Sequence, residues 1–157
     1  RHSSSAASDV YKRQLQDWFD FLQKPNKSFD NMPPCPFAKS AFQRKKIEIV
    51  EYKNMLTVIE YMMKPWEKEV VIFVMQDYGA AYLQWLAIKL GIMYPDFIFL
   101  EDHPDLEENI NGQIMNSGKV LLLVQERKEL EEARRDLMKT KYYEKWTLEL
   151  KQRIFNR

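Results

Sequence analysis

Val70-Val71-Ile72-Phe73-Val74-Met75 is the longest uninterrupted apolar run in the chain. Its β-branched and aromatic residues are typical of a strand, and without polar alternation both faces of that strand must be covered. The run is far shorter than the roughly 20 residues that a helix needs to cross a bilayer. We therefore predict a central strand in a sheet with helices packed on it, and no association with a membrane.

Around this run, segments with strand character alternate with segments of helical periodicity. The predicted strands cover residues 47–52, 70–75, 97–100 and 120–124. The predicted helices cover residues 15–22, 36–46, 54–63, 78–90, 127–138 and 142–155. This order is typical of an α+β or α/β fold and predicts one compact domain over 15–157, with a four-stranded mixed sheet. The order of the strands stays open.

The turn residues between these segments predict where elements end. Asp77 is predicted to cap the helix that follows the central strand, and Gly91 to end it in a left-handed conformation. A long loop precedes the fourth strand and contains Asn111-Gly112 and Asn116-Ser117-Gly118. Its length favours a functional loop over a simple hairpin.

Residues 4–14 match the in-frame translation of a transposase tagmentation oligonucleotide. We therefore expect residues 1–14 to be an adapter-derived, non-native tail on a chain translated from metagenomic or draft-assembly reads. The tail holds three basic residues and one acidic residue, so the totals of 24 basic and 23 acidic fall to 21 and 22. A balance this even argues against nucleic acid as a partner. With a single cysteine and no visible secretory leader, the expected location is the cytoplasm.

The composition also argues against several classes of reaction and binding site. The chain has four glycines, and none lies in a Gly-rich phosphate loop or a dinucleotide fingerprint, which argues against nucleotide hydrolysis and nicotinamide chemistry. One cysteine and one histidine beyond the tail fall short of a zinc ligand set, so no metal site is predicted. The sequence names no cofactor.

Cys35 is the strongest candidate for a functional residue. It stands beside Pro36, where a proline at the first helical position would open a helix, and the helix dipole would favour the thiolate. Lys39, one turn later, could add to that field or hold an anionic ligand. Cys-Pro-Phe-Ala lacks the second cysteine of a redox pair, so only a monothiol role is open. The alternative is a buried cysteine that acts as a small apolar side chain.

His103 is the second candidate, because it follows a predicted strand and is flanked by carboxylates. Asp102 or Asp105 could orient its imidazole as a general base, and Cys35 could be the nucleophile that it serves. The alternative is a solvated acidic turn. The last predicted helix carries a stripe of Tyr143, Trp146, Leu150 and Ile154, interpreted as core contact or, less readily, as a surface for a protein partner.

Three motifs together resemble a family of bacterial proteins called domain of unknown function 1415. Cys35-Pro36-Phe37-Ala38-Lys39 is similar to its Cys-Pro-Phe-Ala signature, and His103-Pro104-Asp105 to its His-Pro-Asp. Asn116-Ser117 stands where the family has an Asn-Arg-Ser-Pro turn, but the arginine and proline are missing here, so Arg127 would have to replace an anion-binding arginine. The resemblance implies a site around Cys35 and His103 with Asn116 nearby, and names no activity.

Two hypotheses follow. In the first, a pocket lined by Cys35 and His103 binds a small anionic ligand or performs thiol-dependent chemistry, with Arg127 or Lys39 holding the anion. In the second, the chain is a non-catalytic interaction module in which Cys35 is a core residue. A cleft that brings Cys35 and His103 together would favour the first.

Overall fold

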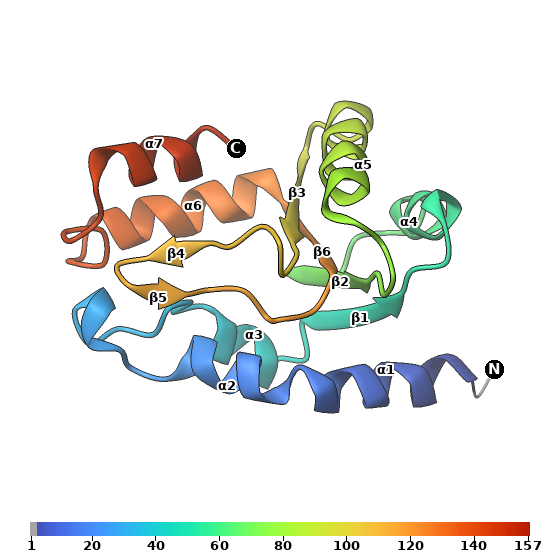
Figure 1. Cartoon of the computed structure of the whole chain (residues 1–157), viewed down its shortest axis with the longest axis horizontal. Helices are drawn as coiled ribbons and strands as arrows, with labels where there is room; N and C mark the ends of the chain where they lie inside the picture. Colours follow the sequence, from blue (N-terminus) through green and yellow to red (C-terminus); the bar gives the residue numbers. More distant parts are fainter. Residues whose placement is uncertain (1–2) are drawn as a thin grey trace.

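The strands form one mixed sheet in the order β1-β2-β6-β3 in a computed structural model that describes residues 3–157, with the backbone alone for 3–5 (Figure 1). Its strands are β1 (Ile47–Glu51), β2 (Val70–Val74), β3 (Phe97–Asp102) and β6 (Leu121–Glu126). β1 and β2 are parallel, and β6 lies antiparallel between β2 and β3. The predicted four-stranded mixed sheet and α+β class are confirmed.

Helices connect and cover the strands. They are α1 (Ser3–Gln14), α2 (Gln16–Gln23), α3 (Ala38–Gln43), α4 (Met55–Met62), α5 (Ala80–Met93), α6 (Arg127–Met138) and α7 (Leu148–Phe155), with a 3-10 turn η1 at Lys27–Phe29. In Figure 1, α1 and α2 run end to end along the bottom of the molecule, and α7 lies above α6. None of the helices in the described part of the chain is long and apolar enough to cross a membrane.

The side chains of the sheet alternate between two apolar cores, as the two-residue period of a strand requires. Val71, Phe73 and Leu122 face the core that α4 and α5 cover. Ile72 and Leu121 face the opposite core, which α1, α2 and α3 cover. β2 is buried along nearly its whole length, which explains why its sequence shows no polar alternation.

A third core lies beside the sheet, where η1, α6 and the turn before α7 meet. Its buried residues are Phe29, Ile110, Leu137, Tyr142, Tyr143 and Trp146. Ile110 belongs to a small hairpin, β4 (Asn109–Ile110) and β5 (Gln113–Ile114). The buried residues of this core all come from outside the main sheet.

Three details of the sequence prediction are wrong, and the long loop holds a feature that was not predicted. Asp77 does not cap α5, because its backbone turns left-handed (φ 68°) and Gly79 takes the cap position. Gly91 does not end α5, since it keeps a negative φ and the helix continues to Met93. Residues 142–146 form turns, and Thr147 caps a shorter α7. The long loop contains a two-residue hairpin, because Asn111 and Gly112 both adopt the positive φ that such a turn needs.

The segment expected to be an adapter-derived tail is helical from residue 3 as α1, and its first two residues lie outside the described residues. α1 runs beneath β1 in Figure 1, and the Tyr11 hydroxyl donates to a Glu51 carboxylate oxygen at 3.4 Å. Leu15, at the junction with α2, is buried in the second core. The origin of the segment is a matter of the nucleotide sequence, so it stays a prediction.

Candidate functional site

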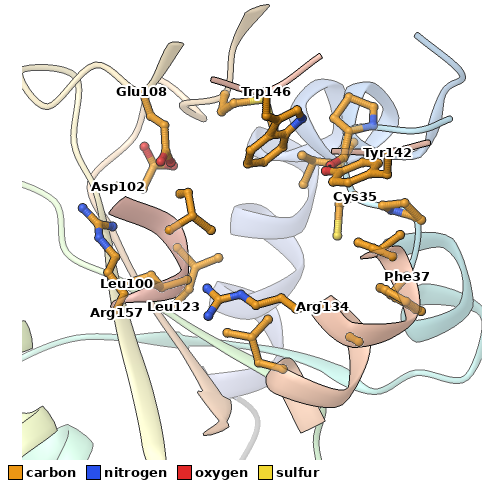
Figure 2. Close-up of a pocket in the computed structure, with 18 of the residues that line it drawn as sticks. Cys35, Phe37, Leu100, Asp102, Glu108, Leu123, Arg134, Tyr142, Trp146 and Arg157 are labelled. Carbon is orange, nitrogen blue, oxygen red and sulfur yellow. The ribbon is translucent and has the colours of Figure 1, made fainter. Parts of the chain in front are cut away.

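A cavity of about 280 Å³ fills the space between the second and third cores (Figure 2). Leu123 of β6 and Leu100 of β3 form its floor, because strand alternation turns both toward the α2 side of the sheet. Trp18 of α2, Cys35, Arg134 of α6 and Trp146 line the remaining walls. The wall is mostly apolar, and the few polar groups on it therefore bear on what it can bind.

Among the residues predicted from the sequence, the structure brings Cys35, Asp102 and Asn116 to this cavity. His103, Lys39 and Arg127 are not among the side chains that line it. The expected Cys35–His103 pocket is therefore not what the chain forms.

Cys35 sits in a tight turn before α3. Its N–H donates to Leu22 O at 3.0 Å, and its carbonyl accepts from Ala38 N at 3.1 Å. In Figure 2 its sulfur projects into the space between Tyr142 and Arg134. Burial raises the pKa of the Cys35 thiol, and hydrogen bonds from the Ala38 and Phe37 N–H groups only partly oppose the rise. The expected lowering of this pKa is wrong, because α3 is only six residues long and its dipole is too weak to offset desolvation.

Two buried tyrosines stand beside the thiol. The Tyr142 hydroxyl donates to the buried carbonyl of Pro34. Burial raises the pKa of Tyr142, and the neighbouring Cys35 raises it further. Burial likewise raises the pKa of Tyr143. At neutral pH, therefore, this part of the wall is uncharged and consists of two phenols and a thiol.

Arg134 is the cationic side chain of the wall that has no ion-pair partner among the described residues. Among residues 3–157, no carboxylate lies within ion-pair distance of its guanidinium. Burial lowers its pKa, and its guanidinium carbon lies 5.9 Å from the centre of the Phe155 ring. Arg134 was not predicted from the sequence, because it stands among many charged residues of α6. A signal was present, since Arg134 shares the i, i+4, i+7 face of Leu130 and Leu137.

The acidic groups on the wall are already engaged. Glu101 pairs with Arg157, beyond the end of α7, at 3.4 Å, and Glu108 pairs with Arg153 of α7 at 3.6 Å. Asp102, which is 6% exposed, accepts from the Asn116 side-chain amide and the Ser117 N–H, both at 3.0 Å. None of these carboxylates is available to balance Arg134.

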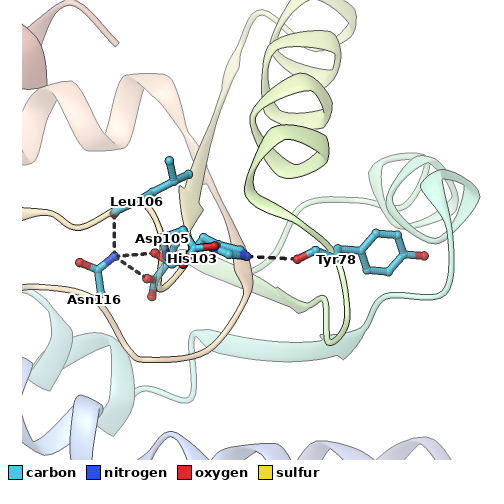
Figure 3. Close-up of polar contacts among 6 residues, drawn as sticks. Tyr78, His103, Asp105, Leu106 and Asn116 are labelled. Carbon is cyan, nitrogen blue, oxygen red and sulfur yellow. Dashed lines mark hydrogen bonds and ion pairs between the residues drawn. The ribbon is translucent and has the colours of Figure 1, made fainter.

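Asp102 and Asn116 belong to a hydrogen-bond network that closes the long loop. Figure 3 shows the contacts of Asn116. Besides Asp102, the Asn116 amide donates to Leu106 O at 3.0 Å and His103 O at 3.3 Å, while its oxygen accepts from Glu108 N at 2.7 Å. Both the amide nitrogen and the amide oxygen of Asn116 therefore make hydrogen bonds to other residues of the protein. The sequence predicted a ligand-binding role for Asn116, but its contacts are those of a structural residue.

His103 faces away from the cavity, because it directly follows Asp102 and successive side chains of an extended chain point to opposite sides. Its Nδ1 accepts from Asp105 N at 3.0 Å, so the proton is on Nε2, which donates to Tyr78 O at 3.2 Å (Figure 3). His103 thereby joins the segments that follow β3 and β2. The Asp105 carboxylate is 83% exposed and 3.8 Å from Nδ1, so it does not hold the imidazole as an orienting carboxylate would.

The two predicted anion-binding residues lie elsewhere. Lys39 is exposed on α3. Arg127 lies at the start of α6, where its Nε donates to Pro95 O at 2.9 Å. Both are therefore unsuited to hold an anion inside the cavity.

The stripe of Tyr143, Trp146, Leu150 and Ile154 belongs to the third core, so its interpretation as core contact is confirmed. Tyr143 and Trp146 are only 8% and 7% exposed, and Leu150 and Ile154 pack against them. A protein partner at this stripe stays a prediction, for which Leu150 and Ile154 are the partly exposed members. The Nε1–H of Trp146 is buried with no hydrogen-bond acceptor among the described residues.

Residues 3–157 hold no group of three or more His, Cys, Asp or Glu side chains arranged to bind a metal ion. Comparison of the chain with protein-family models, curated proteins and solved structures finds no match. The resemblance to domain of unknown function 1415 therefore stays a prediction, and any function must be argued from the cavity itself.

The reactivity of Cys35 tests this description of the site. Since burial raises the pKa of the thiol, alkylation should be slow at pH 7 and should rise only above the ordinary thiol value of about 8.5. His103→Asn should leave the profile unchanged, because His103 does not line the cavity. We would measure iodoacetamide labelling by mass spectrometry between pH 6 and about 10, with folding checked by circular dichroism. A pKa below 8 that His103→Asn raises would restore the nucleophile–base pair.

Proposed function

We propose that the cavity binds a small organic acid whose apolar body fills the space between the two cores and whose anionic group meets Arg134. The observation that carries the proposal is a partly buried guanidinium, without a carboxylate partner among the described residues, on the wall of an apolar cavity. Uncompensated buried charge is costly, and proteins keep it where a ligand supplies the counter-charge.

The volume limits the size of the ligand. An engineered apolar cavity of about 150 Å³ holds benzene, so a space of about 280 Å³ suits roughly two fused rings or a branched chain of similar bulk. Trp146 lines the cavity with its ring, because its Nε1–H is itself buried and not exposed to the cavity. Cys35, neutral at pH 7, then contributes packing rather than a nucleophile.

Naphthoate and naphthamide form a matched pair of probes, since they share two fused rings and differ in charge. We expect naphthoate to bind more tightly by isothermal titration calorimetry, and Arg134→Met to weaken it by about 10- to 100-fold, the loss expected for one charge-assisted hydrogen bond. Methionine keeps the apolar stem that packs in the wall. Arg135→Met, on the exposed side of the same helix, is the control and should change nothing.

Naphthamide should bind wild type and Arg134→Met equally, because it carries no charge for the guanidinium to meet. The proposal fails if neither probe binds at millimolar concentration, or if naphthoate binds Arg134→Met as tightly as wild type. Protection of Cys35 from alkylation by bound naphthoate would locate the probe in the cavity rather than elsewhere on the surface.

A further inference from the structure

The two edge strands of the sheet differ in how far the rest of the chain covers them. β1, at one edge, carries the charged residues Glu48 and Glu51 and lies above α1 in Figure 1. β3, at the other edge, pairs only with β6, and in residues 3–157 no hydrogen bond from outside the sheet reaches its residues 98–102 along the backbone. β3 has six residues with no proline, lysine or bulge to block pairing. Such an edge is a template for another strand.

An apolar helix face lies next to this edge. α5 is mostly apolar, with Gln84 and Lys89 as its exposed polar residues, and it buries one side in the first core. On the opposite side Trp85, Ile88 and Ile92 are 48%, 67% and 77% exposed. Ile88, Ile92 and Gly91 form, with Phe97 to Phe99 of β3, a surface groove of about 320 Å³. Its charged end is lined by Glu101, Arg127 and Arg157, with Arg157 paired to Glu101. An open strand edge and an uncovered helix flank therefore form one continuous surface.

We propose that a second copy of the chain occupies this surface, with β3 of the two copies paired antiparallel about a two-fold axis. A two-fold axis perpendicular to the sheet keeps both α5 helices on the same face, where their Ile88 and Ile92 flanks would pack side by side. Gly91 has no side chain and allows the helices to approach closely. A short peptide would pair with the strand and leave most of the helix face exposed, so a second copy accounts for both features. The proposal is independent of the proposed ligand.

In this arrangement the acidic residues of β3 in one copy do not meet those of the other copy. Pairing centred on Leu100 sets Glu101 opposite Phe99 and Asp102 opposite Ile98 of the second copy, so no two carboxylates face each other. It also brings Glu101 of one copy toward the beginning of β3 in the other. Arg127 lies there, held by Asp96 O through its N–H and by Pro95 O through its Nε.

The apolar area that the dimer would bury allows its strength to be estimated. Full burial removes about 100 Å² for an isoleucine side chain and up to about 250 Å² for tryptophan. The exposed parts of Trp85, Ile88 and Ile92 then supply about 250 Å² per copy, against about 800 Å² in a standard interface. Strand pairing must contribute much of the remainder. We therefore expect a dimer that dissociates in the micromolar range.

Sedimentation equilibrium of the full chain from about 5 to 500 μM tests the proposal, because a micromolar dimer dissociates within that range. Wild type should shift from monomer to dimer. The double variant Ile88→Glu, Ile92→Glu should stay monomeric, since it buries four carboxylates at the dyad. The control is Leu56→Glu, Met63→Glu on α4, whose side chains are 59% and 80% exposed and lie away from the groove, and it should dimerise normally.

Hydrogen exchange separates this dimer from other modes of association. Amides on the outer edge of β3 should become protected as the concentration rises, and β1 amides should not change. A chain that is monomeric at 500 μM overturns the proposal and leaves the surface to a different partner. A dimer that survives the α5 double variant, or that leaves β3 exchange unaltered, overturns it as well.

Discussion

Asp102→Ala is expected to destabilise the domain by roughly 2–4 kcal/mol. The carboxylate is buried and accepts two hydrogen bonds, from the Asn116 side chain and the Ser117 N–H, and hydrogen bonds to a charged group are worth about 1.5–3 kcal/mol each. Alanine removes both acceptors and leaves the Ser117 N–H without its partner. The free energy of unfolding from urea titration measures the loss.

Asp105→Ala is the matched control for this prediction. Its carboxylate is 83% exposed, and the hydrogen bond to His103 Nδ1 comes from its backbone N–H, which alanine keeps. Its effect should stay within about 0.5 kcal/mol, as for most surface substitutions. Equal effects of the two substitutions would contradict the structural role assigned to Asp102. The contrast matters because both carboxylates were predicted from the sequence to orient His103.

Local patterns in the sequence were sufficient to predict the sheet. The apolar run of β2, the alternating segments around it and the crossover through α4 are determined by nearby residues, and they predicted a four-stranded mixed sheet. Details that depend on a single backbone angle were missed. Asp77 is an ordinary helix cap by residue type, but its positive φ is imposed by the turn in which it lies.

The site was harder to predict than the fold, because its residues meet only through long-range packing. Cys35 was predicted as a site residue because it is a lone cysteine between two prolines. Arg134 was not predicted, because α6 contains many other charged residues. His103 was assigned to the pocket because it is close to Asp102 in sequence. That nearness places it on the opposite side of the chain, since adjacent residues of a strand alternate. Its two hydrogen bonds join backbone segments and serve the fold.

Trp146→Ala is expected to destabilise the domain by about 3–5 kcal/mol, the range for truncating a buried aromatic side chain. Trp146 is 7% exposed and lies in edge-on contact with Tyr143, with ring centres 4.9 Å apart. Its loss would enlarge the existing cavity and open the third core. Thermal and urea unfolding would both show the change.

Trp146→Phe separates packing from hydrogen bonding at the same position. Phenylalanine keeps an aromatic ring in the third core but removes the Nε1–H, which finds no acceptor among the described residues. An unpaired buried donor costs about 1–3 kcal/mol, so its removal should offset much of the lost contact area and leave stability within about 1 kcal/mol of wild type. Because the Nε1–H is not exposed to the cavity, naphthoate affinity should change by less than about 2-fold. A variant as unstable as Trp146→Ala would show that the indole is needed for its shape, and a larger loss of affinity would show that the indole N–H does reach the ligand.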